Sequence, residues 1–141
     1  TALYGDPVFE SLMVSKNKIM NDICDKELVP TYSYWRMYTN TATLKMHSDR
    51  PSCEFSVSVM IDSDKTPWPF IAGENSIMQK PGDAVIYKGC DLKHGRPEAY
   101  KGDYHAQVFL HYVDKNGKNK DFIYDTRPYL GMPANERRRS K

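Results

Sequence analysis

A histidine and an aspartate, His47 and Asp49, stand one residue apart in the stretch LKMHSDRPSCEFSVSVMID. On an extended strand, side chains two residues apart point to the same face, so both could bind one metal ion. A proline turn and a second strand-like run follow this pair. The sequence therefore places two good metal ligands at the end of a strand, beside a hairpin, although such a pair is also common in polar surface turns.

A third ligand is expected from another part of the chain. Of the four histidines, His94 lies just beyond the turn-then-strand stretch KPGDAVIYKG. Two histidines and one carboxylate form a facial triad that binds iron(II) and leaves coordination positions open. We therefore expect His47, Asp49 and His94 to bind one iron(II). The alternative is that His94 is an exposed loop residue in DLKHGRP.

The rest of the sequence predicts a mainly β fold. Near-helical apolar spacing over residues 7–25 predicts a helical lead, in which Ser15 caps a second helix. Short strand-like runs with proline and glycine turns follow, which is typical of a sandwich or jelly roll. The expected strands are 31–39, 41–47, 54–62, 75–79, 83–89 and 104–114.

Two of these runs alternate clearly between faces. In run 54–62, Phe55, Val57 and Val59 share one face, while Ser56, Ser58 and Met60 share the other. In run 104–114, His105, Gln107, Phe109 and His111 share a face. That polar face is either solvated or the wall of a polar pocket, and the pattern alone leaves both open.

Length and composition bound the class of protein. The 141 residues suit one domain, 1–141, with a helical lead at 1–28 and a basic flexible tail at 133–141. The net charge of +2 and the short ERRRSK cluster give no reason to expect a nucleic-acid partner. No run reaches the roughly 20 apolar residues of a membrane span, so no membrane partner is expected. The first residues lack a signal pattern and an initiator methionine, so we expect a trimmed chain or a fragment.

The cysteines indicate the compartment. Cys24, Cys53 and Cys90 are odd in number and widely spaced, so they fit neither a disulfide framework nor a zinc ribbon. Free thiols predict a reducing, cytoplasmic location. Cys53 follows the His/Asp pair closely, so it is either near the metal or a small buried filler.

At these residues the sequence resembles the iron(II)/2-oxoglutarate-dependent dioxygenases, in particular the prolyl-hydroxylase-like branch. That branch often shows Tyr-x-x-Gly-x-x-Tyr-x-x-His-x-Asp. In YTNTATLKMHSD, Tyr38 stands at the first tyrosine, Thr41 at the glycine and Leu44 at the second tyrosine. KPGDAVIYKG resembles the strand and turn that lead to the distal histidine, and the likeness extends over residues 31–114.

The resemblance implies a fold, a cofactor and a reaction. The implied fold is a double-stranded β-helix, a jelly roll of two facing sheets with supporting N-terminal helices. The implied cofactor is Fe(II), with 2-oxoglutarate and O2 as cosubstrates. Such enzymes hydroxylate an aliphatic C–H bond and release succinate and CO2. The substrate class would be a peptide, with a peptidyl proline as one candidate, or a small molecule.

One departure from the family concerns the far carboxylate of 2-oxoglutarate. The family usually carries an arginine or lysine about ten residues after the distal histidine, where this chain has Tyr104 and His105. We expect Arg96, two residues from His94, to bind that carboxylate with both ends of its planar fork. The expected neutral or switchable partners are Tyr38, His105 and Gln107.

Two other readings stay open. A cupin-like metal-binding jelly roll without oxygenase activity is one, although cupins usually carry a His-x-His pair that this chain lacks. A catalytically inactive binding module is the other, and the missing cation supports it. We expect Arg36 and Arg50 to be surface or ion-pair residues, and Trp35 and Trp68 to serve packing.

Overall fold

The structure is a computed structural model that describes residues 1–135 of the chain. One strand precedes two α-helices near the N-terminus, eight further strands follow them, and two short 3-10 helices lie between and after the strands. The helices are α1 (Pro7–Ser15), α2 (Asn17–Cys24), η1 (Pro51–Cys53) and η2 (Lys120–Thr126). The strands are β1 (Ala2–Tyr4), β2 (Leu28–Thr39), β3 (Leu44–His47), β4 (Phe55–Ser63), β5 (Phe70–Ala72), β6 (Asn75–Ile77), β7 (Ala84–Tyr87), β8 (His94–Arg96) and β9 (Tyr104–Asp114).

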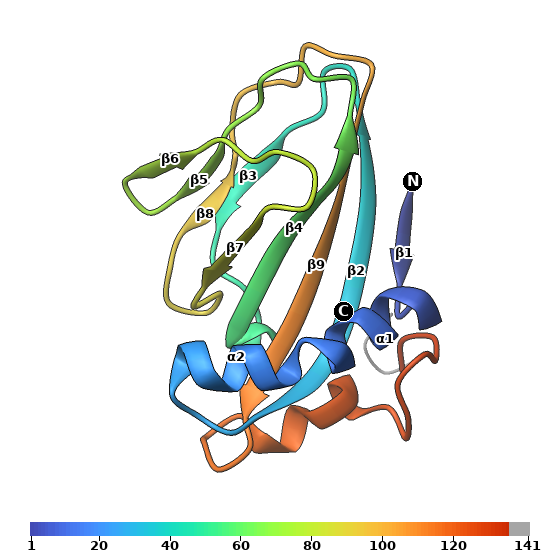
Figure 1. Cartoon of the computed structure of the whole chain (residues 1–141), viewed down its shortest axis with the longest axis vertical. Helices are drawn as coiled ribbons and strands as arrows, with labels where there is room; N and C mark the ends of the chain where they lie inside the picture. Colours follow the sequence, from blue (N-terminus) through green and yellow to red (C-terminus); the bar gives the residue numbers. More distant parts are fainter. Residues whose placement is uncertain (136–141) are drawn as a thin grey trace.

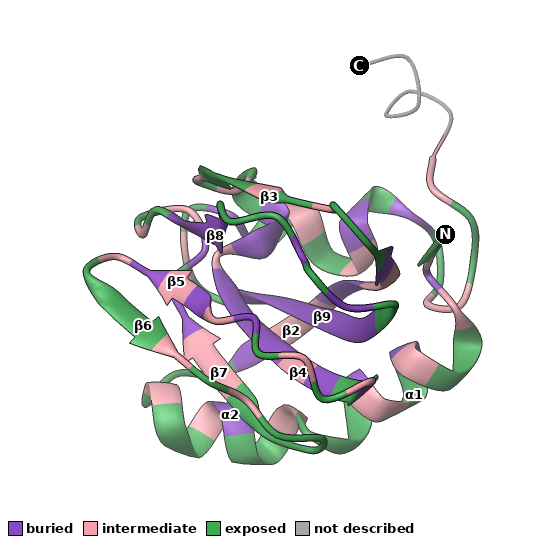
Figure 2. Ribbon diagram, turned by 90° about the horizontal axis from the view of Figure 1, so that it is seen from above, coloured by how far each residue is buried: buried purple, intermediate pink, exposed green. Residues whose placement is uncertain are grey.

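The strands form two antiparallel sheets that face each other. The larger sheet has the order β1-β2-β9-β4-β7, and the smaller has the order β3-β8-β5-β6. The long strands β2, β9 and β4 run side by side, and the shorter strands of the second sheet lie opposite them (Figure 1). Both helices cover the outer face of the larger sheet (Figure 2). The predicted mainly β jelly roll with N-terminal supporting helices is therefore confirmed.

Alternation gives the larger sheet two buried faces of opposite character. On the outer face, Val57, Leu110 and Val108 pack with Met13 and Met20 of the helices in one apolar cluster. The inner face, toward the second sheet, carries the polar set, and β9 is buried along most of its length (Figure 2). The buried residues of that inner face include Ser56, Ser58, His105, Gln107, Phe109 and His111. The polar face of β9 is therefore buried inside the jelly roll and not solvated.

The helical lead differs from the prediction at its junction. Asp6 caps α1 by accepting hydrogen bonds from the backbone N–H groups of Val8 and Phe9. The prediction that Ser15 caps the second helix is wrong, since Lys16 occupies the N-cap position of α2. Ser15 ends α1, and its hydroxyl donates to Leu12 O within the same helix at 2.7 Å. Among the described residues, no helix is both long and apolar enough to cross a membrane.

Several short segments were not anticipated. The first 28 residues contain β1 as well as helices, and β1 pairs with β2. His94, which was expected just beyond a strand, begins the short strand β8. Of the basic tail predicted at 133–141, residues 136–141 lie outside the described part of the chain.

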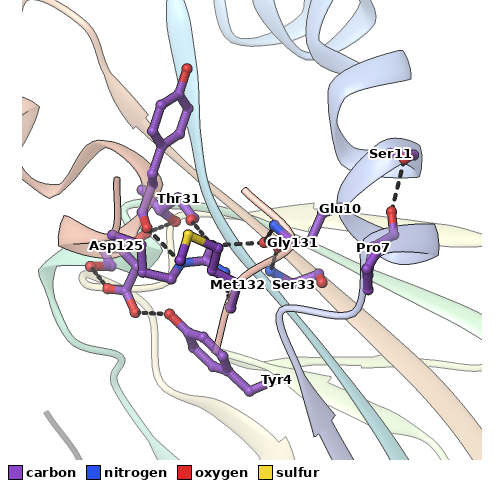
Figure 3. Close-up of polar contacts among 12 residues, drawn as sticks. Tyr4, Pro7, Glu10, Ser11, Thr31, Ser33, Asp125, Gly131 and Met132 are labelled. Atoms are coloured by element: carbon purple, nitrogen blue, oxygen red, sulfur yellow. Dashed lines mark hydrogen bonds and ion pairs between the residues drawn. The ribbon is translucent and has the colours of Figure 1, made fainter. Parts of the chain in front are cut away.

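A buried ion pair ties the C-terminal segment to α1 and β2. Arg127 Nη2 lies 2.7 Å from Glu10 Oε1, and both side chains are almost fully buried. Glu10 also accepts from Gly131 N at 3.0 Å and from Ser33 N at 2.5 Å. Figure 3 shows Glu10 between Ser33 and Gly131 at this junction.

A second ion pair holds the same segment against the end of β3. Arg50 donates through two nitrogens to Asp125, at 2.6 and 2.8 Å. Asp125 also accepts from Ser52 Oγ at 2.6 Å and from the Tyr4 hydroxyl at 2.5 Å (Figure 3). Residues 124–126 all have positive φ, a strained conformation that persists only when its surroundings fix it. We refer to the two pairs, Glu10–Arg127 and Arg50–Asp125, as the C-terminal anchor.

Candidate metal centre

Strands β3 and β8 bring the three predicted metal ligands together. His47 ends β3 and is the cross-strand partner of His94 at the start of β8, with the two ring centres 4.5 Å apart. Asp49 Oδ1 lies 3.0 Å from His47 Nε2, and Asp49 Oδ2 lies 3.2 Å from His94 Nε2. One ligand atom from each residue falls within 4.8 Å of the others. Two imidazoles and one carboxylate are the ligand set of a facial triad, which would hold an iron ion here.

Backbone carbonyls orient both histidines for metal binding. His47 Nδ1 bonds to Lys45 O, and His94 Nδ1 bonds to Leu92 O, each at 2.7 Å. A carbonyl oxygen only accepts, so each Nδ1 donates its proton there and each Nε2 is directed toward Asp49. This outer hydrogen bond fixes the tautomer and the ring orientation, as in most histidine metal sites.

The loop before β8 approaches the carboxylate closely because it contains a glycine. Gly89 O accepts from Asp49 N at 2.8 Å. A Cβ atom at Gly89 would lie 2.6 Å from Asp49 Oδ2 and 2.9 Å from Ser56 Oγ, and it would also collide with Cys53 O. Any larger residue at this position would displace the carboxylate, so Gly89 helps to define the site.

The carboxylate and one histidine stabilise each other's charge. Burial alone would raise the pKa of Asp49, but the hydrogen bond to His94 and the nearby histidines lower it. Burial alone would lower the pKa of His94, but its hydrogen bonds to Asp49 and Leu92 O raise it. In the metal-free protein this pair therefore favours a protonated His94. A bound metal cation would replace the His94 proton and balance the charge of Asp49 in its place.

A cavity of about 170 Å³ between the two sheets opens onto these ligands. Among its lining residues, Arg36 is the one with a permanent positive charge, and its guanidinium carbon lies 4.7 Å from the centre of the Tyr38 ring. The cavity is lined by Tyr32, Tyr34, Arg36, Tyr38, Leu44, His47, Asp49, Tyr87, His94, Phe109 and His111. Arg36 was expected to be a surface or ion-pair residue; it is half-buried and lines this cavity.

The sequence carried a signal for Arg36. Tyr34, Arg36 and Tyr38 follow one another at a period of two on β2, so their side chains share a face. Arg36 is the cross-strand partner of Gln107, and Tyr38 is the partner of His105. Arg36 therefore belongs to the same polar inner face as the predicted cosubstrate residues.

The structure brings together the four residues predicted to bind 2-oxoglutarate. His105 Nε2 bonds to Gln107 Oε1 at 2.9 Å. Gln107 Nε2 donates to Gln79 Oε1, which also accepts from Arg96 Nη2, both at 2.9 Å. The rings of Tyr38 and His105 have centres 6.3 Å apart. Tyr38, His105, Gln107 and Arg96 thus form one connected region inside the jelly roll.

The fork of Arg96 is already engaged by the protein. Arg96 Nη1 donates to Trp68 O at 2.5 Å and Nη2 donates to Gln79, while Nε is the guanidinium nitrogen without a partner within residues 1–135. Trp68 itself is buried in an aromatic cluster with Tyr38 and Tyr100, as the packing role predicted. A two-ended contact between Arg96 and a carboxylate would require these bonds to break.

Three buried polar atoms in this region have no hydrogen-bond partner within residues 1–135. They are Tyr38 Oη, Arg96 Nε and His105 Nδ1. Because Gln107 Oε1 only accepts, His105 Nε2 carries the proton and Nδ1 has a lone pair. Burial, and then the charge of Arg96, lower the pKa of His105 to about 4, so this histidine is neutral near pH 7. Burial also lowers the pKa of Arg96 to about 10, which leaves it charged.

The other residues considered from the sequence take structural roles. Arg50 is an ion-pair residue of the C-terminal anchor, as expected. Trp35 packs against the core cluster beneath the helices. Cys53 is buried and lies close to Asp49 and His111, so it is both the expected buried residue and a neighbour of the metal ligands.

Comparisons with known proteins locate the fold. No family model matches the chain, and no curated protein matches it. Among solved structures, a 2OG-Fe(II) oxygenase family oxidoreductase from Burkholderia pseudomallei superposes with a TM-score of 0.59 and 18% identity, over 74% of this chain and 55% of that one. AviO1 from Streptomyces viridochromogenes superposes with a TM-score of 0.57 and 14% identity, over 72% of this chain and 57% of that one. A cupin 2 conserved barrel domain protein from Salinispora arenicola superposes with a TM-score of 0.42 and 9% identity, over 57% of this chain and 61% of that one.

The first two of these likenesses agree with the observed jelly roll. This chain spans a little over half the length of each of those two proteins. At such low identity the comparison establishes the architecture alone. The chemistry must be inferred from the residues of this chain.

Proposed function

We propose that this protein is an iron(II)- and 2-oxoglutarate-dependent oxygenase that hydroxylates an aliphatic C–H bond. The observation that supports it best is the triad of His47, Asp49 and His94, with both Nε2 atoms directed at the carboxylate, at a cavity that holds a permanent cation. When bound, iron and 2-oxoglutarate would supply the oxidising power, with release of succinate and CO2. The residues of the chain bind and orient these groups.

The donor set of the site fits iron(II). Two imidazoles and one carboxylate are the ligands of non-haem iron(II) oxygenases, whereas thiolate-rich sets favour other metals. His94 is 2% exposed, and its bonded Nδ1 prevents the ring from turning away. Both observations support a preorganised site for one iron ion.

The cavity also fits a dicarboxylate. A carboxylate taken out of water requires charged or hydrogen-bonding partners, because an unpaired buried charge costs several kcal/mol. Arg36 offers a charged fork, Tyr38 lines the same cavity with an unpaired hydroxyl, and Arg96, whose Nε is unpaired, is an electrostatic neighbour of Tyr38. We therefore propose Arg36 as the main partner of the far carboxylate, supported by Tyr38 and Arg96.

The remaining two residues receive smaller roles in this proposal. His105 is neutral near pH 7, so it adds no positive charge for the carboxylate. Gln107 donates to Ser58 Oγ at 2.6 Å and to Gln79, which keeps the inner wall in place beside Arg36. For the primary substrate, the aromatic side chains of Tyr32, Tyr34 and Phe109 line the cavity and suit a prolyl or similar aliphatic group.

A metal-binding jelly roll without oxygenase activity is the second candidate. The observation that favours it is the fork of Arg96, which binds Trp68 O and Gln79 and is not free to receive a cosubstrate. In that case the protein would bind a metal at the triad but would not bind 2-oxoglutarate. The two candidates therefore differ in one measurable property.

The test is an anaerobic titration of the metal-free protein with iron(II) and then 2-oxoglutarate. We expect a visible metal-to-ligand charge-transfer band, and succinate formation once O2 is admitted. Arg36→Ala should raise the half-saturating 2-oxoglutarate concentration at least tenfold and leave iron binding intact. One charge-assisted contact is worth about 1.5–3 kcal/mol, and about 1.4 kcal/mol is a factor of ten.

Arg96→Ala is the matched comparison for Arg36→Ala. It should have the smaller effect on 2-oxoglutarate, because only its Nε is available to a ligand. The opposite order would return the main role to Arg96. A protein that binds iron tightly yet shows neither the band nor succinate would support the second candidate.

A further inference from the structure

A second cluster of metal-ligating side chains adjoins the proposed iron site. Asp49, Cys53 and His111 each offer one ligand atom, and these atoms lie within 4.8 Å of one another. Cys53 is 2% exposed and His111 is 5% exposed, so the cluster is built into the interior. Thiolate, imidazole and carboxylate together form a ligand set typical of zinc and of its spectroscopic substitute cobalt(II).

The histidine of this cluster is held in the tautomer that metal binding needs. Ser56 Oγ donates its proton to Cys53 O at 3.0 Å. Ser56 must therefore accept the 2.7 Å bond from His111 Nδ1. Nδ1 is protonated as a result, and Nε2 of His111 keeps its lone pair. This outer hydrogen bond matches those that orient His47 and His94.

The cysteine is also fixed in place. Its backbone N–H donates to Arg50 O at 2.9 Å within η1, and its Sγ lies 3.2 Å from the Tyr32 hydroxyl. Burial, and then the charge of Asp49, raise the pKa of Cys53, so it is a thiol in the metal-free protein. A metal cation would displace that proton and take up the thiolate charge.

The shared carboxylate lies between the two sets of ligands. Its Oδ1 is next to His47 and its Oδ2 is next to His94. Asp49 Oδ2, Cys53 O and Ser56 Oγ all lie within 2.9 Å of where a Cβ atom of Gly89 would be, so the carboxylate and the segment that carries Cys53 are neighbours. Asp49 and His111 both line the cavity, which gives a metal ion a route to the cluster.

We propose that Asp49, Cys53 and His111 form a second metal site, for a borderline divalent cation such as zinc, that shares Asp49 with the iron site. Asp49 would contribute a carboxylate oxygen to each of the two sites. The inference depends on the proposed function only through Asp49, because Cys53 and His111 take no part in the iron triad.

Cobalt(II) titration of the metal-free full chain, without oxygen, tests this inference. The expected result is a near-ultraviolet thiolate-to-cobalt charge-transfer band and a stoichiometry that exceeds one ion per chain. Cys53→Ser should abolish the band, and His111→Gln should weaken cobalt binding at this site at least tenfold. Cys90→Ser is the matched control and should keep the band, since Cys90 lies outside the cluster.

A double variant, His47→Ala/His94→Ala, separates this inference from the proposed function. It removes the iron triad and should retain the sulfur-to-cobalt band. A wild-type protein that binds cobalt without a sulfur band would overturn the second site and leave the iron site standing. A band that persists in both Cys53→Ser and His111→Gln would also overturn it. A sulfur band in a protein that fails to bind 2-oxoglutarate would support the second site and count against the oxygenase.

Discussion

The C-terminal anchor and the cavity region are both buried and polar, but they differ in how fully their polar atoms are paired. In the anchor, Arg127 donates to Glu10 and to three backbone carbonyls, and Asp125 accepts from three side chains. In the cavity region, Tyr38 Oη, Arg96 Nε and His105 Nδ1 lack partners among the described residues.

This difference separates two uses of buried polarity. A buried group whose hydrogen bonds are complete holds the fold in one arrangement. A buried group left unpaired costs free energy in the ligand-free protein, and that cost is removed when a ligand supplies the partner. We therefore expect substitutions in the anchor to reduce stability, and substitutions in the cavity region to reduce ligand affinity.

The largest expected effect is the loss of stability when the anchor is broken. Arg127→Met should lower the free energy of unfolding by about 3–5 kcal/mol, because it leaves Glu10 buried without its charge partner. Denaturant unfolding of the metal-free protein measures this change. Iron affinity of the folded variant should stay within about threefold of wild type, since neither Arg127 nor Glu10 is among the residues that line the cavity at the triad.

The control is the double variant Glu10→Gln/Arg127→Met. Without the unpaired charge it should recover part of the lost free energy, whereas Glu10→Gln alone should also be destabilised. A loss below about 1 kcal/mol in Arg127→Met would mean that the pair is not important for stability. That result would remove the contrast between the two regions.

A second prediction concerns the stability of the metal-free protein at low pH. Burial lowers the pKa of His105 and of His111 to about 4, against about 6.5 in an unfolded chain. Between these values the unfolded chain binds protons that the folded chain does not, so stability falls as pH falls from about 6.5 to about 4. We expect a loss of about 2 kcal/mol per histidine at pH 4.5 in the metal-free protein.

The shifted pKa values of His94 and Asp49 do not cancel this loss of stability between about pH 6.5 and pH 4. The raised pKa of His94 gives stabilisation that is already present below about 6.5 and is lost as pH rises. The lowered pKa of Asp49 matters only below its ordinary value of 3.8. Denaturant unfolding at pH 7 and 4.5 measures the loss. His105→Gln should reduce it by about half, and equal stability at both pH values in wild type would contradict the prediction.

The sequence was most informative where the relevant residues are close together in the chain. The spacing of His47 and Asp49 predicted that they lie together, and the structure brings them next to His94, although β3 ends at His47 and Asp49 lies just beyond it. The long strands β2, β4 and β9 were also visible as alternating or β-rich runs. The family-like order of the ligands placed these strands in a jelly roll, which the structure confirms.

Features that depend on long-range packing were not predictable. The helices cover the apolar face of the large sheet, so its polar face turns inward, and this decides that Arg36 lines the cavity. The occupied fork of Arg96 depends on Trp68 and Gln79, which reach it from distant parts of the chain. The pairing of Glu10 with Arg127 likewise joins the two ends of the domain, and no local pattern indicates it.

The smallest effects that we predict are those of replacing one tyrosine at the C-terminal anchor and one in the cavity region. The Tyr4 hydroxyl donates to Asp125 at 2.5 Å, whereas the buried Tyr38 hydroxyl has no partner within residues 1–135. Tyr4→Phe should therefore destabilise the protein by about 1–2 kcal/mol, as expected for a hydrogen bond to a carboxylate. Tyr38→Phe should leave the stability of the metal-free protein unchanged or slightly higher, because it removes an unpaired buried hydroxyl.

For 2-oxoglutarate affinity we expect the reverse: Tyr38→Phe should have the larger effect and Tyr4→Phe the smaller one. Tyr38→Phe should weaken 2-oxoglutarate binding to the iron-loaded protein by about fivefold, the equivalent of one ordinary hydrogen bond of roughly 1 kcal/mol. Tyr4→Phe should leave that affinity unchanged. Unfolding curves and anaerobic 2-oxoglutarate titrations of both variants measure the two effects. If Tyr38→Phe lost stability as Tyr4→Phe does and kept full 2-oxoglutarate affinity, Tyr38 would be a structural residue, and the unpaired hydroxyl would carry no information about the ligand.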